Sequence, residues 1–168
     1  MIEKWELVDI NKNKTGVIHE RGKEDSIPKG MYHLIVEIWT KNINEEILLT
    51  QRHPDKNYGL MWECSGGSVV VGEESTEAAI RELFEETGIS ADSKAVKHLG
   101  TTIKSNYIVD TYLYVLDDET PKLHLQAEEV VSATWVSLDD MNSKKEQIVG
   151  GVWERYCRFE EQIISFTR

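Results

Sequence analysis

A chain of 168 residues with 40% apolar residues can fill one hydrophobic core but is short for two, so we expect a single domain over residues 1–168. Its net charge of −11 disfavours a nucleic acid polymer as a partner, because neutralisation of phosphates by Lys and Arg supplies most of that affinity. The longest apolar runs fall far below the roughly 20 residues that a membrane-spanning helix needs. A small-molecule ligand therefore fits better than a nucleic acid or a membrane.

The first residues carry charges where a secretory signal peptide would be apolar, which predicts a cytoplasmic protein. Cys64 and Cys157 are too few and too far apart to indicate a disulfide framework or a zinc site, so we expect two reduced thiols. The composition leaves open whether the protein is a monomer or a homodimer.

Strand patterns outnumber helix patterns along the chain. Alternating residues at 5–10, a polar turn at 11–16 and a return at 17–19 predict an N-terminal hairpin over residues 1–20. Aromatic and β-branched residues predict further strands at 32–39, 46–50, 61–64, 68–71, 108–116 and 130–136.

Two long helices are expected. The first begins after Ser75, which can act as the N-cap, and ends before Gly88, which suits a left-handed position after a helix. The second lies in residues 150–168, with its clearest pattern between 152 and 165. Strands joined partly by hairpins and flanked by two helices favour an α+β fold with a mixed central sheet.

The first helix has an acidic face. At about 100° per residue, Glu82, Glu85 and Glu86 fall within an arc of roughly 100°. The other side holds the residues expected to pack, namely Thr76, Ala79, Ile80, Leu83, Phe84 and Thr87. Clustered carboxylates repel one another unless a cation lies between them, and their hard oxygen atoms suit Mg²⁺ or Mn²⁺. On spacing alone, however, a solvated acidic surface is the commoner explanation.

A longer pattern favours the metal site. Gly67 is followed after five residues by Glu73, and after seven more by Arg81-Glu82-Leu83-x-Glu85-Glu86-x-Gly88-Ile89. Seven fixed positions at background frequencies of roughly 6% match by chance about once in 10⁸ starting points. The pattern over residues 67–89 is that of the Nudix box, and on it the chain resembles the Nudix hydrolases.

The resemblance implies the Nudix fold, an α/β/α sandwich whose box forms a loop, a helix and a loop. It implies that Glu82, Glu85 and Glu86 hold Mg²⁺ (or Mn²⁺), with the backbone carbonyl at Gly66 approaching the metal. Arg81 is expected to orient the carboxylates by charge-assisted hydrogen bonds.

The resemblance also implies a reaction, in which a metal-activated water attacks one phosphorus of a diphosphate and a glutamate acts as general base. Glu85 is the first choice for this base. Glu128 and Glu129 are alternatives that could equally be surface charges. Glu73 is expected to brace the loop.

Four residues outside the box are candidates for substrate binding. Arg52 and Lys56 could bind the outer phosphate, and Trp62 and Trp153 could stack on a base. Each has an ordinary alternative, because the two cations could simply solvate a loop and the two aromatic residues could belong to the core.

Nearly the whole chain also resembles the branch of Nudix proteins related to isopentenyl-diphosphate isomerase. The similar segments are residues 5–9, 32–34, 61–63 and 125–135. The isomerases have a Cys-Gly-His sequence where this chain has Gly66-Gly67-Ser68, and Cys64, two residues earlier, is expected to be a small buried residue. Of the isomerase metal ligands only His33 is matched, while the other positions hold Ser26, Ile108 and Asp110.

The sequence thus predicts a hydrolase that cleaves a phosphoanhydride bond in a nucleoside diphosphate-linked or related small molecule. An isomerase resembling isopentenyl-diphosphate isomerase is the alternative. A non-catalytic Nudix module that senses a nucleotide is disfavoured by the complete set of glutamates and by the lack of a DNA-binding pattern.

Overall fold

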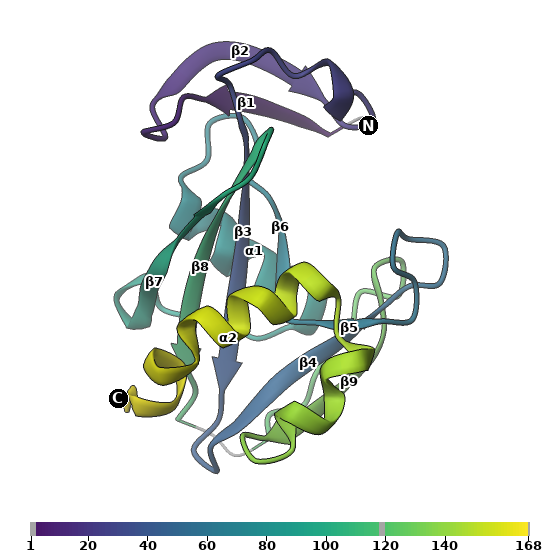
Figure 1. Ribbon diagram of the computed structural model, residues 1–168. Helices are drawn as coiled ribbons and strands as arrows, with labels where there is room; N and C mark the ends of the chain where they lie inside the picture. Colours follow the sequence, from purple (N-terminus) through teal and green to yellow (C-terminus); the bar gives the residue numbers. More distant parts are fainter. Residues whose placement is uncertain (1–2, 118–119, 168) are drawn as a thin grey trace.

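A computed structural model describes residues 3–117 and 120–167 (Figure 1). The strands are β1 (Lys4–Val8), β2 (Lys14–Glu20), β3 (His33–Lys41), β4 (Glu46–Arg52), β5 (Trp62–Glu63), β6 (Ser65–Ser68), β7 (Val96–Ile103), β8 (Tyr107–Val115) and β9 (Val130–Ser137). The helices are α1 (Ser75–Thr87) and α2 (Gly150–Ser165), with short 3₁₀ segments at Glu24–Ser26, Ser93–Ala95 and Met141–Gln147. No helix in these described ranges is long and apolar enough to cross a membrane.

Within the described residues, seven strands form a mixed sheet. Its main order is β5-β4-β3-β8-β7, with β6 paired to β3 and β9 paired to β4. The β3–β8 pair is parallel, and the other pairs are antiparallel. The helices α1 and α2 cover opposite faces of this sheet (Figure 1). The expected α+β fold, an α/β/α sandwich, is confirmed.

Alternating side chains of β3 contribute to both hydrophobic cores, one under α1 and one under α2. Val36 and Ile38 pack with Ala79 and Leu83 of α1, whereas Trp39 packs on the α2 side. Side chains of a strand point alternately to the two faces, so one strand serves two helices. Both layers therefore depend on β3, and α1 is held against the sheet by its apolar side.

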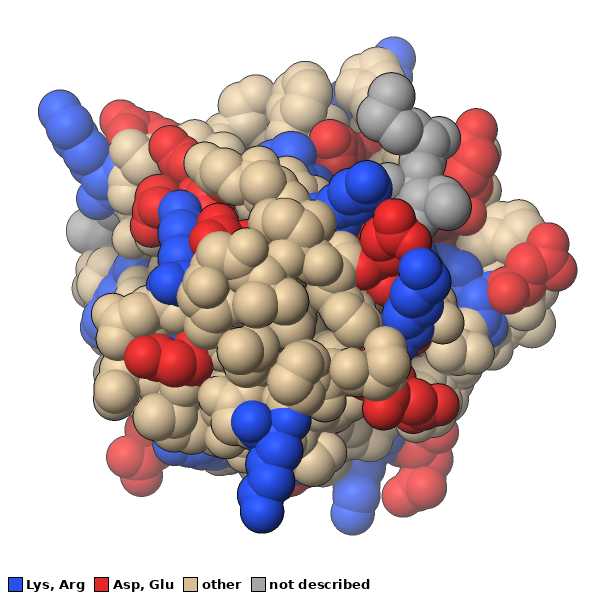
Figure 2. Space-filling model, turned by 90° about the horizontal axis from the view of Figure 1, so that it is seen from above, with Lys and Arg blue, Asp and Glu red and all other residues tan. Residues whose placement is uncertain are grey.

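The hairpin β1–β2 is a separate two-stranded sheet at one end of the molecule (Figure 1). This agrees with the hairpin expected from the sequence. Trp5 and Leu7 are buried, while Ile10, Val17 and Ile18 are exposed. Seen from above, this end shows an uncharged central area bordered by charged side chains (Figure 2). The hairpin thus packs on the sheet by one side only.

The strand predicted next to Gly66 and Gly67 was placed too far along the chain. The valine-rich segment 68–71 was expected to be a strand, but the strand is β6, Ser65–Ser68. Gly66 and Gly67 pair with Glu37 and Val36 of β3. A Cβ atom on Gly66 would lie 2.4 Å from the carbonyl oxygen of Val36, so only glycine fits there. Close backbone approach outweighed the β propensity of the valines.

Other boundaries differ more mildly. Strand β7 was not predicted, since its polar residues and Gly100 interrupt the pattern. The N-cap of α1 is Glu74, which forms a capping box with Glu77, and Ser75 is already helical. Gly88 has φ 77°, as expected of the residue that ends α1. Helix α2 ends at Ser165, and residue 168 lies outside the described part of the chain.

Candidate active site

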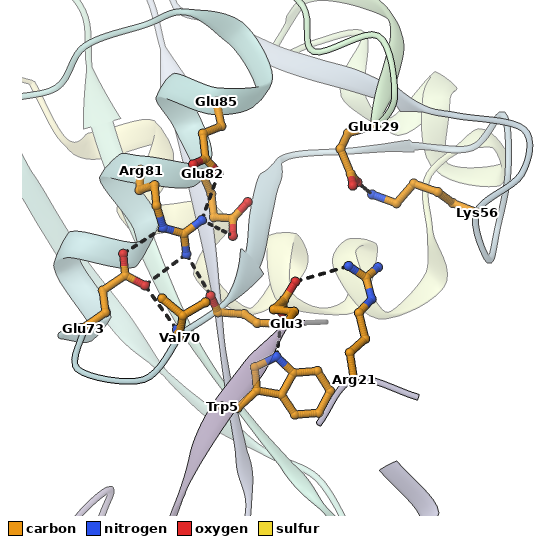
Figure 3. Close-up of polar contacts among 11 residues, drawn as sticks. Glu3, Trp5, Arg21, Lys56, Val70, Glu73, Arg81, Glu82, Glu85 and Glu129 are labelled. Carbon is orange, nitrogen blue, oxygen red and sulfur yellow. Dashed lines mark hydrogen bonds and ion pairs between the residues drawn. The ribbon is translucent and has the colours of Figure 1, made fainter. Parts of the chain in front are cut away.

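Arg81 joins α1 to the loop that precedes it (Figure 3). Its Nε donates to Oε1 of Glu73 at 2.8 Å, and its Nη2 donates to Oε2 of Glu73 at 3.0 Å. The same Nη2 donates to the carbonyl oxygen of Ser68 at 2.9 Å, while Glu73 accepts from the backbone N–H of Val70 at 3.2 Å. The loop is therefore fixed to the helix by one planar guanidinium and one carboxylate.

The remaining nitrogen of Arg81 contacts two of the predicted metal ligands. Nη1 donates to Glu82 Oε1 at 2.8 Å and to Glu85 Oε2 at 3.0 Å. Hydrogen bonds to Glu73 and the negative charge of Glu82 raise the pKa of Arg81, so it stays protonated. A Cβ atom on Gly67 would lie 2.3 Å from Glu82 Oε1, so the glycine makes room for this carboxylate.

Glu86 has a different environment from its two neighbours. Its side chain is 3% exposed, and among the described residues Oε2 has no hydrogen-bond partner. Burial raises the pKa of Glu86 well above its usual range, and the nearby charges of Glu63 and Glu82 raise it further. Burial also raises the pKa of Glu82. Both carboxylates would be stabilised by a cation.

The expected division of α1 into a packed and a solvated face was therefore partly wrong. Glu86 is buried, and Phe84, expected in the core, is 55% exposed. The segment after β8 passes over the end of α1, where His124 N–H donates to the carbonyl of Thr87 at 2.8 Å. This distant segment changes which positions are covered, and helical periodicity alone does not reveal it.

The donor set fits a divalent metal, although the glutamates do not form a ready site. Among residues 3–117 and 120–167, no three acidic, His or Cys side chains are arranged to hold a metal as they stand. The reason lies in Arg81, which bridges Glu82 and Glu85 where a cation would otherwise balance them. A buried carboxylate oxygen without a partner and two hard oxygen donors beside it suit Mg²⁺ or Mn²⁺.

A cavity of about 410 Å³ opens beside Glu82, Glu85 and Arg81. Its remaining lining is Glu3, Trp5, Arg21, Glu24, His33, Ile35, Lys56, Gly66, Gly67, Ser68, Gln126 and Glu129. A smaller cavity of about 210 Å³ shares Arg21, Ile35, Lys56, Gly66 and Gly67 with it. The two cavities are therefore neighbouring parts of one recess.

The two cations predicted to bind phosphate, Lys56 and Arg52, lie at this recess, but each already forms an ion pair with a glutamate. Lys56 lines both cavities and forms an ion pair with Glu129 (Figure 3). Arg52 lines the smaller cavity, where Nη1 lies 2.6 Å from both oxygens of Glu63. Of the two alternative bases, Glu129 lines the larger cavity, whereas Glu128 faces a separate hollow.

Trp62 and Trp153 lie away from the recess. Neither lines either cavity, and both pack against the core beneath α2, where Trp153 stacks on Tyr156 with ring centroids 5.2 Å apart. Trp62 and Glu63 are neighbours in a strand, so their side chains point to opposite faces and only Glu63 reaches the recess. The structure thus assigns both tryptophans to packing and not to base stacking.

The hairpin contributes residues that the sequence reasoning missed. Glu3, Trp5 and Arg21 of the hairpin and its ends, with Glu24 of the next 3₁₀ segment, line the larger cavity, although the sequence marked none of them as a site residue. Trp5 stacks on His33 with ring centroids 3.6 Å apart, and burial lowers the pKa of His33 to about 4. No spacing signal marks these residues, because they reach the site only through packing of a separate sheet.

Of the residues relevant to an isomerase, His33 lines the larger cavity and Cys64 the smaller one, whereas Asp110 lines neither. Cys64 is buried, and burial raises the pKa of its thiol well above the usual range. Asp110 lines neither part of the recess, and it accepts hydrogen bonds from Lys12, Thr101 and Ser75. A reactive thiol beside an isomerase metal site is therefore not formed.

Strand β6 with its two glycines, the loop after it and the acidic helix α1, which Arg81 ties to that loop, form one site on an α/β/α sandwich. Such a loop–helix–loop site on this sandwich defines the class of enzyme. The family model of the NUDIX domain matches residues 31–157. The chain belongs to the Nudix hydrolase family.

Known proteins agree with this assignment. A Nudix hydrolase of Listeria monocytogenes is 33% identical over 152 residues, 84% of each chain. An isopentenyl-diphosphate Delta-isomerase of Pectobacterium atrosepticum is 28% identical over 147 residues, 82% of this chain and 78% of that protein. The branch related to the isomerases has only this weaker support.

Solved structures share the fold. The crystal structure of DR0079 from Deinococcus radiodurans superposes with a TM-score of 0.75 at 19% identity, over 94% of this chain and 99% of that one. A bifunctional NMN adenylyltransferase/ADP ribose pyrophosphatase of Francisella tularensis superposes with a TM-score of 0.69 at 20% identity, over 83% of this chain and 44% of that one.

Proposed function

We propose that the chain is a divalent-metal-dependent hydrolase that cleaves a phosphoanhydride bond in a nucleoside diphosphate-linked or related small molecule. The observation that carries this proposal is the buried Oε2 of Glu86, which has no partner among the described residues, on the same helix as Glu82 and Glu85, which line a recess large enough for a small ligand. The Francisella structure described above was solved with AMP and a Mn ion, which agrees with a nucleotide substrate and this class of metal.

In this proposal Glu82, Glu85 and Glu86 hold the cation, Mg²⁺ (or Mn²⁺), together with the carbonyl oxygen of Gly66. Such a cation, when bound, neutralises charge on the phosphoryl oxygens and lowers the pKa of water. Glu85 is 46% exposed and lines the cavity, so it can accept the proton of the attacking water as general base. Arg81 would keep the loop attached to the helix through Glu73 and Ser68, and a bound cation would replace its Nη1 as the partner of Glu82 and Glu85.

Isomerisation of isopentenyl diphosphate is the second candidate, supported by the Pectobacterium relative. It needs two groups that add and remove protons on opposite sides of an alkene. The buried Cys64 thiol and the fully bonded Asp110 do not provide them, which favours hydrolysis.

The test is a release assay over a library of nucleotide sugars, dinucleotides and nucleoside di- and triphosphates, with Mg²⁺ and with Mn²⁺, run beside an isomerase assay. We expect metal-dependent release of a nucleotide, no dimethylallyl diphosphate, and a Cys64→Ala enzyme whose kcat stays within about threefold of the parent. Formation of the prenyl product without hydrolysis of any nucleotide would replace the hydrolase proposal by the isomerase one.

A further inference from the structure

The hairpin places one arginine at the junction of the two cavities. Arg21 follows β2 directly and lines both the larger and the smaller cavity. Its backbone N–H donates to the carbonyl of Glu3 at 3.1 Å, and β1 and β2 are paired at Lys4 and Glu20 next to it. The backbone is therefore held in place, while the side chain extends into the recess opposite Arg81 (Figure 3).

Among the described residues, the cations of the recess differ in how many donors they have already used. Arg81 makes five hydrogen bonds to protein oxygens, and Arg52 makes three. Lys56 is 20% exposed and paired with Glu129. Arg21 makes one hydrogen bond, from Nη1 to Glu3 at 3.2 Å, and its side chain is 57% exposed. It has the most donors available to a ligand.

We propose that Arg21 is a substrate-binding residue that leaves Glu3 to bind a phosphate of the diphosphate group. This inference rests on the proposed function. A guanidinium presents a planar pair of N–H donors that matches two phosphate oxygens, and such bidentate pairs are among the stronger hydrogen bonds. The contact with Glu3 is exposed and weak, so exchanging it for a phosphate costs little.

Position within the recess supports the same assignment. Arg21 and Lys56 are the two cations that line both cavities. Gly66 and Gly67 of β6 line both as well, and Glu82 and Glu85 of α1 line the larger one. A diphosphate held at one end by the metal site would place its other phosphate in the same recess as these two cations. The matched family region begins at residue 31, so Arg21, which directly follows β2, lies outside it.

The test compares three variants by steady-state kinetics on the best substrate of the library. Arg21→Ala is expected to raise KM at least about tenfold with a small change in kcat, because a charged hydrogen-bonding pair is lost. Glu3→Gln keeps an acceptor for Trp5 but frees Arg21, so KM should fall. Lys23→Ala is the matched control, since Lys23 also forms an exposed ion pair near the hairpin, with Glu20, and lines neither cavity.

The outcomes separate this inference from the proposed function. If Arg21 only stabilised the hairpin through Glu3, both variants of that pair would raise KM alike, and the inference would be wrong. It also fails if Arg21→Ala matches Lys23→Ala. Binding of α,β-methylene-ADP with Mg²⁺, measured by calorimetry, needs no turnover. Weaker binding to Arg21→Ala than to the parent would support Arg21 even if no library compound were hydrolysed, whereas equal binding would contradict it.

Discussion

Two buried carboxylates lie near opposite ends of α1, and their surroundings differ. Asp110, near the start, is 1% exposed and accepts hydrogen bonds from Lys12 at 2.9 and 3.0 Å, Thr101 at 2.6 Å and Ser75 at 2.7 Å. Burial alone would raise the pKa of Asp110, but these donors outweigh burial and lower it. Asp110 is stable as an anion.

Glu86, near the other end, has weaker compensation, from a hydrogen bond with Ser65 and the charge of Lys56. Its Oε2 has no partner among the described residues, and burial with the charges of Glu63 and Glu82 raises its pKa well above the usual range. Hydrogen-bond donors around a buried carboxylate therefore decide its role. With enough donors, as at Asp110, the carboxylate is stable within the protein, whereas with few donors, as at Glu86, a bound cation can stabilise it. Both side chains carry a carboxylate, and both are buried.

The largest expected effect is on turnover. Glu86→Gln and Glu85→Gln should each lower kcat by at least about 100-fold while the fold is kept, because a metal ligand or the base is lost. Excess chelator should abolish activity, and Mg²⁺ should restore it. Glu161→Gln, on the exposed side of α2, is the control and should match the parent. Full activity in chelator would contradict the metal-dependent site.

Substitutions at the two ends of α1 should have opposite effects on the free energy of unfolding. Lys12→Met leaves Asp110 as a buried anion without its cation, and the free energy of unfolding should fall by about 2 kcal/mol, less than for a fully buried pair because Lys12 is one-third exposed. Glu86→Gln removes a carboxylate whose charged form is disfavoured by burial, and it should leave that free energy unchanged or higher. Urea unfolding in chelator measures both. An equal loss of unfolding free energy in the two variants would show that Asp110 and Glu86 do not differ in this way.

The smallest effect concerns a buried base beside the same recess. Burial lowers the pKa of His33 to about 4, so the unfolded chain binds the proton more tightly, and stability is lost as pH falls from about 6.5 towards 4. Between pH 7 and pH 5.5 this amounts to about 1 kcal/mol. His33→Phe keeps an aromatic ring against Trp5 and should remove that part of the loss. Parallel pH dependences of unfolding in the parent and the variant would show that His33 does not contribute.

Local sequence patterns account for much of the fold. Hydrophobic alternation predicted the hairpin, aromatic and β-branched residues predicted β3, and the capping residues predicted α1 with its end at Gly88. The shift of the glycine strand to β6 escaped prediction because it depends on how closely the backbone of β3 approaches. Propensity describes a residue with its chain neighbours, whereas such an approach involves residues far away in the chain.

The site divides in the same way. Glu82, Glu85 and Arg81 are neighbours along one helix, so spacing could place them together. The burial of Glu86 and the presence of Arg21 could not be predicted, since one depends on the segment after β8 and the other on a separate sheet. The tryptophans were misassigned because composition does not tell which face of the sheet an aromatic side chain occupies.

The parallel pairing of β3 with β8 also bears on how the protein folds. Strand β6 with its two glycines and helix α1 lie in the chain segment between these two strands. Strands β3 and β8 pair along their whole length, from His33 with Tyr107 to Lys41 with Val115. Forming this pair closes a long loop, and such contacts are slow to form because chain entropy opposes them. The residues of the box are continuous in sequence, but their arrangement in space depends on strands outside the box. A peptide containing only residues 67–89 would keep every motif residue and still lack the sheet against which α1 is oriented.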